Sequence, residues 1–149
     1  MVKLSGGCLC GSIRYTILKE PLLAYTCNCR FCQKDTGTAY RSALAILNEN
    51  VELSGEKLSI YTYKSAEHGR ELYKNFCSGC GTTISLKTKR FPERQVIMIG
   101  TLDDPSQITL KTHMFVEEAL DWVEFPKEHV TYARHRINED GTPAAPTNQ

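Results

Sequence analysis

The chain has 149 residues, of which 41% are hydrophobic and 23% are charged, so its composition is that of an ordinary folded domain and not of a disordered chain. Its formal net charge is +1, which excludes the concentrated basic surface of a nucleic-acid-binding protein. No segment approaches the roughly 20 apolar residues that a membrane-spanning helix requires. We therefore expect a cytoplasmic protein whose partners include neither nucleic acid nor a membrane.

Short runs in which apolar and polar residues alternate occur along most of the chain. The first run places Ile13, Tyr15 and Ile17 on one face, which is typical of a half-buried strand. Turn residues bound each further run. Many short strands at close spacing predict a mainly β fold and not a βαβ fold. The further runs are Thr38–Leu47, Val51–Ser54, Leu58–Tyr63, Glu71–Phe76, Thr82–Leu86 and Gln95–Thr101.

Helical signals are sparse. The sequence predicts one short helical turn at Gln33–Thr36 and a second around Glu117–Trp122. Asp and Pro residues at Leu102–Pro105 indicate a turn that ends the preceding strand. The last twelve residues, 138–149, have two prolines and no apolar periodicity. We therefore expect one domain over residues 1–137 and a disordered tail over residues 138–149.

Seven cysteines are the outlying feature of the composition. An odd number cannot form a complete disulfide framework, and disulfides are rare in a reducing compartment, so metal binding or thiol chemistry is the favoured explanation. A single cysteine is most often a small buried apolar residue. Here every cysteine belongs to a cluster, which favours metal ligation. The clusters are Cys8 and Cys10; Cys27, Cys29 and Cys32; and Cys77 and Cys80.

The cluster spacing predicts zinc. Thiolates two or three residues apart can converge on one tetrahedral zinc ion, and C-x-x-C is a common half-site. Glycine after the last cysteine, as at Gly11 and Gly81, allows a tight turn around the metal. The first and third clusters can together form a closed structural site. Its four ligands would be Cys8, Cys10, Cys77 and Cys80.

The middle cluster supplies three ligands, and no histidine has local spacing to it. Three protein ligands with an open position are typical of catalytic zinc, and a site of sulfur ligands favours a further thiolate. Two alternatives stay open on spacing alone. Cys27, Cys29 and Cys32 could recruit a ligand from another cluster, or a distant His or Asp could complete a second structural site.

These motifs resemble those of the glutathione-dependent formaldehyde-activating enzyme family, which also contains centromere protein V. The resemblance covers about residues 5–126, in order and with family-like intervals. It rests on GGCLCGSIRY at residues 6–15, the cysteines of residues 27–32 with Thr36-Gly37, FCSGCGT at residues 76–82 and GTLDDP at residues 100–105.

The resemblance implies a β-tent fold, built of small antiparallel sheets held by zinc knuckles, and two zinc ions per chain. It assigns Cys8, Cys10, Cys77 and Cys80 to the structural zinc and Cys27, Cys29 and Cys32 to the catalytic zinc. It also implies a carbon–sulfur lyase that joins a small thiol, glutathione, to formaldehyde or cleaves the adduct. Asn28 stands where histidine is frequent in the family, and Trp122 fits an aromatic position of the family.

A glutathione-like substrate carries two carboxylates, so its site should offer cations. Arg30 and Lys34 are the nearest candidates, and Lys87, Lys89 and Arg90 form a second set; the alternative is that these charges are solvated surface. Two other classes of function remain: a zinc scaffold that binds a partner without chemistry, and a thiol sensor with a metal-free reactive cysteine. The sequence carries no signal of oligomeric state.

Overall fold

The computed structural model describes residues 3–148, which form two compact units. Unit 1 comprises residues 3–23 and 44–108, and unit 2 comprises residues 24–43 and 109–148. The strands are β1 Leu4–Gly7, β2 Ile13–Ile17, β3 Leu23–Cys27, β4 Arg41–Leu47, β5 Val51–Gly55, β6 Ser59–Lys64, β7 Glu71–Phe76, β8 Thr83–Thr88, β9 Arg94–Met98, β10 Thr112–Met114 and β11 Val130–Thr131. Within the described residues the helices are α1, Arg30–Thr36, and short 3₁₀ turns at Asn48–Asn50, Ile99–Thr101, Pro105–Gln107 and Val116–Glu118.

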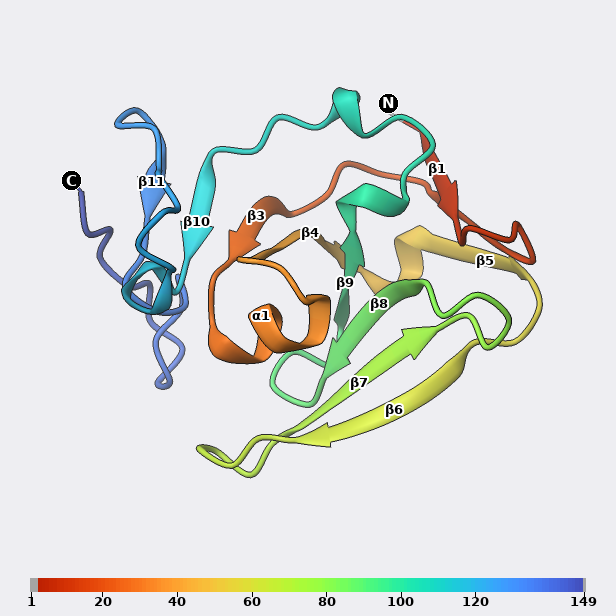
Figure 1. The fold of residues 1–149 in the computed structure, drawn as a ribbon, viewed down its shortest axis with the longest axis horizontal. Coiled ribbons are helices and arrows are strands. Elements are labelled where there is room, and N and C mark those ends of the chain that lie inside the picture. The colour runs from red at the N-terminus through yellow and green to blue at the C-terminus, as the bar shows by residue number, and fades with distance from the viewer. Residues whose placement is uncertain (1–2, 149) are drawn as a thin grey trace. The chain divides into compact units, whose positions relative to one another are not determined.

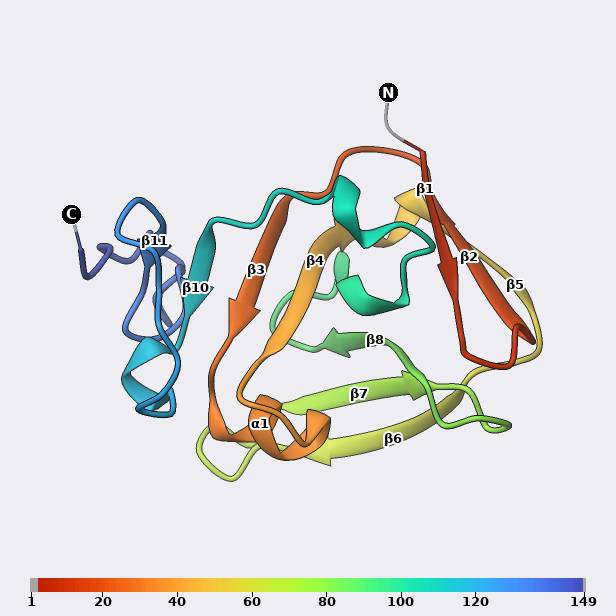
Figure 2. The same cartoon turned by 45° about the horizontal axis from the view of Figure 1, so that its top comes forward.

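Unit 1 contains an antiparallel sheet in the order β1-β2-β5 (Figure 1 and Figure 2). The alternation read in the sequence is confirmed, since Ile13, Tyr15 and Ile17 of its central strand are fully buried. Each such side chain stabilises the core by about 1.5–3 kcal/mol. The Tyr15 hydroxyl is not left unpaired, because it lies 2.8 Å from the Thr101 hydroxyl. This sheet carries the first cysteine cluster in the turn between β1 and β2.

A second sheet of unit 1 has the antiparallel order β6-β7-β8-β9 (Figure 1). The part of β4 from Leu44 onward lies beside β9. Leu44, Ile46, Ile84 and Ile97 of these strands are fully buried in the core. The third cysteine cluster follows β7, in the turn that leads to β8.

In unit 2, β10 pairs in parallel with both β3 and β11. This differs from the expectation of antiparallel sheets throughout. Met114 of β10 is in register with Cys27 of β3, and the matching positions of the two strands are 87 residues apart, so no hairpin dictates an antiparallel direction. The mainly β fold of small sheets with little helix is confirmed.

The seven predicted strands are all present, with no boundary moved by more than three residues. Four strands were not predicted, namely β1, β3, β10 and β11, because they are short or contain glycine and cysteine instead of alternating apolar residues. The helix begins three residues earlier than predicted, because the Cys29 side chain caps it. The predicted helix around 117–122 was wrong: a single 3₁₀ turn follows Phe115, whose φ is 56°.

The described part of the C-terminal segment makes backbone hydrogen bonds. Thr147 N–H donates to the Thr131 carbonyl at 2.8 Å, and Ala144 N–H donates to the Arg136 carbonyl at 2.9 Å. The domain boundary at residue 137 and the disordered tail stay predictions, although these bonds place residues 138–148 within unit 2. Among residues 3–148, no helix is long and apolar enough to cross a membrane.

Candidate metal centres

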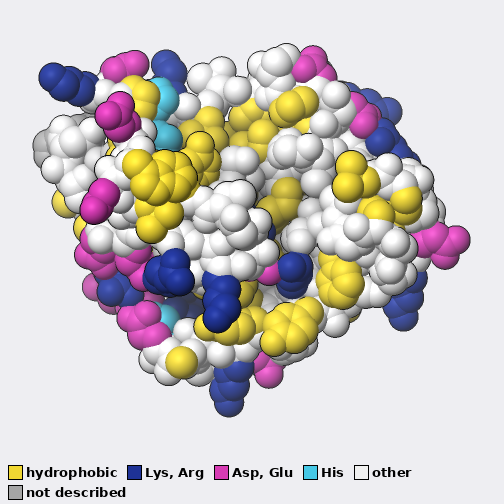
Figure 3. All heavy atoms as spheres, viewed as in Figure 1, with side chains coloured by type: hydrophobic (Ala, Val, Ile, Leu, Met, Phe, Trp, Pro, Cys, Tyr) yellow, Lys and Arg dark blue, Asp and Glu magenta, His cyan; other side chains and the backbone are white. Residues whose placement is uncertain are grey.

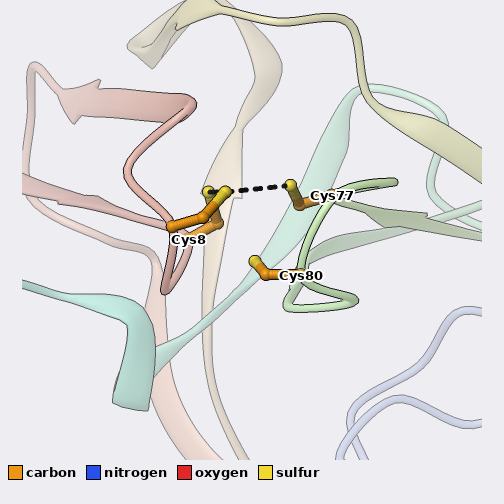
Figure 4. Close-up of side chains that lie close together, drawn as sticks. Cys8, Cys77 and Cys80 are labelled. Carbon is orange, nitrogen blue, oxygen red and sulfur yellow. Dashed lines mark hydrogen bonds between the residues drawn. The ribbon is translucent and has the colours of Figure 1, made fainter.

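Four cysteines of unit 1 come together from two turns. Their Sγ atoms all lie within 4.8 Å of one another. Figure 4 shows Cys8 facing Cys77 and Cys80 across the gap between the β1–β2 and β7–β8 turns. Cys10 Sγ lies 3.6 Å from Cys8 Sγ and 3.7 Å from Cys77 Sγ. The structure thus joins the first and third clusters, although they are far apart in the sequence.

The spacing of these sulfurs fits a tetrahedral metal ion. Zn–S bonds of about 2.3 Å at the tetrahedral angle place neighbouring sulfurs at roughly 3.8 Å. The two Sγ distances from Cys10 are close to this value. Four soft thiolates in a tetrahedral arrangement suit zinc and leave no position for a substrate. The group can therefore hold a metal ion in a closed site.

Hydroxyl and backbone groups stabilise these thiolates. The Ile13 N–H donates to Cys8 Sγ at 3.3 Å, and the Ser12 hydroxyl lies 3.1 Å from Cys10 Sγ. The hydrogen bond from the Thr82 hydroxyl, at 3.1 Å, lowers the pKa of Cys80 to about 5. Gly11 and Gly81 have φ of 78° and 77°, which confirms the prediction that each turn needs a glycine.

Three cysteines of unit 2 form a second group whose Sγ atoms lie within 4.8 Å of one another. Cys27 is the last residue of β3, Cys29 caps the N-terminus of α1, and Cys32 lies in its first turn. Cys29 Sγ accepts a hydrogen bond from the Cys32 N–H and lies 3.4 Å from Cys27 Sγ. Cys27 and Cys32 are buried, whereas Cys29 is half-buried. Within residues 3–148, no fourth Cys, His, Asp or Glu joins this group.

The protonation of the three thiols shows why the group suits a cation. Hydrogen bonds from Cys27 and Cys32 lower the pKa of Cys29 to about 3. The same contact with Cys29, together with burial, raises the pKa of Cys27 well above its ordinary value. The contacts within the group therefore favour the thiolate form at Cys29 and disfavour it at Cys27. Three thiolates so close together require a positive charge among them, which a divalent ion would supply.

Arg41 is a neighbour of this group that the sequence analysis missed. It is buried at the start of β4, and its Nε donates to Cys32 Sγ at 3.5 Å. Its Nη2 forms an ion pair with the Asp35 carboxylate. One signal could have revealed it, since Arg41 lies in period-two phase with the buried Ala39 and Ala43. An arginine on the buried face of a predicted strand requires a partner.

Glu118 is a second neighbour that was missed. Burial, together with the negative charge of Cys29, raises the pKa of its carboxyl group, which accepts a hydrogen bond from the Arg30 backbone N–H. Gln33 fixes this arrangement, because its Nε2 donates to the Glu118 carbonyl at 2.9 Å and to the Asn28 carbonyl at 2.7 Å. Nothing in the sequence links Glu118 to the cysteines, which precede it by more than 80 residues.

Asn28 lies between Cys27 and Cys29, and its side-chain amide donates to groups other than the thiolates. It is fully buried, and its Nδ2 donates to the Met114 carbonyl at 3.0 Å and to the Thr26 hydroxyl at 3.3 Å. The Thr26 hydroxyl lies 2.7 Å from His113 Nδ1, and His113 Nε2 lies 2.9 Å from His129 Nδ1. A chain of polar groups thus runs from the cysteine segment to two histidines.

The predicted substrate cations lie in different places. Arg30 and Lys34 are exposed and occupy neighbouring positions, four residues apart, on α1. The second set, Lys87, Lys89 and Arg90, belongs to unit 1, and its Lys89 pairs with Glu71 at 3.0 Å. Basic and acidic side chains are interspersed over the face shown in Figure 3. Trp122 of unit 2 is 72% exposed.

Comparison with known proteins agrees with this geometry. A solved Rhodobacter sphaeroides protein, a structural-genomics target, is 21% identical over 69% of this chain and 93% of that chain, with a TM-score of 0.54. This likeness shows a shared fold. A family model described as glutathione-dependent formaldehyde-activating enzyme matches residues 3–118, a range that includes all seven cysteines. The chain therefore belongs to the glutathione-dependent formaldehyde-activating enzyme family.

Proposed function

We propose that this protein is a carbon–sulfur lyase that binds two zinc ions and adds a small thiol such as glutathione to formaldehyde, or cleaves the adduct. The observation that supports this most strongly is the three-cysteine group, on a chain of the formaldehyde-activating family. It combines three converging sulfurs with a half-buried Cys29, so a ligand can approach from solvent. Three protein ligands with an open position are typical of catalytic zinc.

Zinc is the metal that we propose for both groups. Both consist of thiols alone, and soft thiolate ligands select zinc over magnesium, calcium or manganese. Cys8, Cys10, Cys77 and Cys80 would hold a structural ion, and Cys27, Cys29 and Cys32 a catalytic one. A bound zinc ion at the second group would supply positive charge that favours the thiolate form of a substrate thiol, whose free pKa is about 8.5.

The side chains of unit 2 would bind and orient the substrate. The first turn of α1 and the end of β3 fix the three sulfurs, and Gln33 holds the loop that carries Glu118 against them. Arg30 and Lys34 are exposed on the same helix, with Arg30 Nη1 donating to Gln33 Oε1 at 2.6 Å, and would attract the carboxylates of glutathione. Glu118, whose pKa is raised by burial and by the charge of Cys29, would exchange a proton with the reacting groups.

The reaction itself needs no oxidant or reductant. The thiol sulfur forms a bond to the carbonyl carbon of formaldehyde, and the π electron pair of the carbonyl moves to its oxygen. That oxygen takes up a proton to replace the one that the thiol has lost. The product is S-hydroxymethylglutathione, and the reverse steps cleave its carbon–sulfur bond. Holding the two reactants in one orientation is the main contribution that such a site can make.

NMR exchange spectroscopy of glutathione and formaldehyde, with and without the zinc-loaded protein, tests this proposal. We expect faster interconversion of free glutathione and its hydroxymethyl adduct in the presence of the protein, and loss of the acceleration in Cys29→Ser. Lys111→Gln, which changes an exposed lysine of the same unit, should keep the full effect. No acceleration by the unmodified protein would remove this reaction and favour the zinc-scaffold alternative.

The cytoplasm is the compartment that we propose. All seven cysteines are free thiols in the structure, and metal binding requires that they stay reduced. A reducing compartment maintains that state.

A further inference from the structure

Arg41 is the only lysine or arginine among the buried residues of the described chain. Its side chain is 3% exposed. Burial of a cation is strongly unfavourable unless the charge is paired and its donors are satisfied. The contacts of Arg41 therefore show which negatively charged groups offset its buried charge.

Those contacts lie on one helix of unit 2. The carboxylate of Asp35, near the C-terminal end of α1, pairs with Nη2, while Cys32, in the first turn, accepts from Nε at 3.5 Å. The guanidinium carbon lies 5.9 Å from the centroid of the Phe31 ring. Asp35 is itself 12% exposed. One acidic partner would suffice to neutralise Arg41, yet its fork also reaches a sulfur.

The charge balance explains this second contact. A divalent ion held by three thiolates carries one net negative charge, and the Asp35 carboxylate adds another next to it. With Arg41 the surroundings carry one negative charge in total; without Arg41 they carry two in a buried place. The arginine also donates to Cys32 Sγ, and a donor at this atom favours the thiolate form, which is the form that a metal binds.

We infer that Arg41, anchored by Asp35, is a positioning residue that holds the Cys32 thiolate for the metal and offsets the negative charge of the three-cysteine group. This inference rests on the proposed zinc ion at that group. It extends the proposed function, because it assigns control of the metal affinity of the three-cysteine group to a residue outside the cysteine motifs.

Arg134 provides a matched control within the same unit. It lies 3.5 Å from the Glu117 carboxylate, and its guanidinium carbon is 5.9 Å from the Phe115 ring, as Arg41 is from Phe31. Its side chain is 54% exposed, however, and it lies away from the cysteine motifs in the sequence. Arg134→Gln therefore removes an arginine from a carboxylate and an aromatic ring without removing a buried cation.

The experiment measures zinc affinity by competition with a chromophoric chelator. The binding step that disappears in Cys29→Ser identifies the three-cysteine group, and the remaining step is an internal reference for the fold. We expect Arg41→Gln to weaken the first step about 10- to 100-fold and to leave the second unchanged. Arg41→Lys should recover at least half of the logarithmic loss, because it restores the charge. Asp35→Asn added to Arg41→Gln should recover part of it by removing the negative charge of the carboxylate.

Several outcomes would overturn the inference. One is an affinity for Arg41→Gln within twofold of that for Arg134→Gln; another is an equal loss at both steps, which would show a general effect on folding. A third is an Arg41→Lys variant no better than Arg41→Gln. If the unmodified protein binds one zinc ion, the proposed function fails together with this inference. Two zinc ions that are insensitive to Arg41 would overturn the inference alone.

Discussion

The two groups both consist of cysteine thiols, but the chain brings these thiols together in different ways. The group of Cys8, Cys10, Cys77 and Cys80 joins two turns that are 67 residues apart between Cys10 and Cys77. The group of Cys27, Cys29 and Cys32 lies within six consecutive residues, where β3 leads into α1. A metal in the first group would close a long loop, whereas a metal in the second would bind a segment whose shape the helix already sets.

The side chains that surround the two cysteine groups also differ in charge. Around the first group, small neutral donors such as the hydroxyls of Ser12 and Thr82 contact the sulfurs, and Gly11 and Gly81 turn the backbone. Around the second, charged side chains are present: Arg41 donates to Cys32, and the Glu118 carboxyl interacts electrostatically with Cys29. Neutral hydrogen-bond donors suit a site that only has to hold its metal ion. Charged neighbours suit a site where a ligand and protons exchange.

The strongest test of this contrast is Cys77→Ser. Because a structural zinc ion contributes about 10–16 kcal/mol of apparent binding energy to folding, we expect the variant to unfold or aggregate. Far-UV circular dichroism and soluble yield measure the effect. Ser78→Ala, in the same turn, is the control and should remain folded. A folded, monodisperse Cys77→Ser protein that still holds two metal ions would show that the first group is not structural.

Cys29→Ser should have a smaller and separate effect. We expect the zinc content to fall by about one equivalent, while the circular dichroism spectrum and cooperative unfolding are preserved, since α1 retains a side-chain oxygen at its N-cap position. Atomic absorption on the purified protein gives the stoichiometry. Unchanged stoichiometry would contradict an independent second site, and unfolding would remove the contrast between the two groups.

Removing the charges on α1 tests whether the second group faces a carboxylate-bearing thiol. Each of Arg30→Gln and Lys34→Gln should raise the KM for glutathione about two- to fivefold, since an exposed ion pair contributes about 0.2–1 kcal/mol. The effect should shrink at high salt. With 2-mercaptoethanol, which has no carboxylate, neither variant should differ from the unmodified protein. An equal loss with both thiols would assign these residues a structural role.

The sequence predicted the features that depend on local pattern. Ile13, Tyr15 and Ile17 alternate, so their strand could be placed, and Gly11 and Gly81 follow cysteines at tight turns. The joining of the two distant cysteine clusters followed from the family resemblance, because spacing alone left other partitions open. Metal-binding cysteines can be predicted from the sequence because metal ligation restricts both the residue type and the interval between ligands.

The supporting residues could not be predicted in the same way. Glu118 and His113 reach the cysteine segment through tertiary contacts, and β10, which carries His113, has only three residues and pairs in parallel with a distant strand. Such pairing leaves no local signal. Arg41 did leave one, through its phase with Ala39 and Ala43, but its partner could be known only from the structure.

The smallest predicted effect concerns His113, which links the cysteine segment to His129. Burial and the charge of His129 lower the pKa of His113 below its ordinary value of about 6.5, so the folded protein favours the neutral ring. As the pH falls below about 6.5, the unfolded chain gains a proton at this residue that the folded protein resists. The free energy of unfolding should therefore decrease with falling pH in that window.

Denaturant unfolding of metal-saturated protein at pH 7.5 and 5.5 measures this decrease in the free energy of unfolding. His113→Gln should be less stable at both pH values, because it loses the buried hydrogen bond to Thr26, but its stability should fall less between them. Acid protonation of the metal-binding thiols acts on both proteins alike, so the difference in slope isolates the histidine. His68→Gln, at an exposed position of unit 1, should keep the full slope. Equal pH dependence of the free energy of unfolding in the unmodified protein and His113→Gln would contradict a role for His113 in acid sensitivity. The metal ligands would then be the source of any loss of stability at low pH.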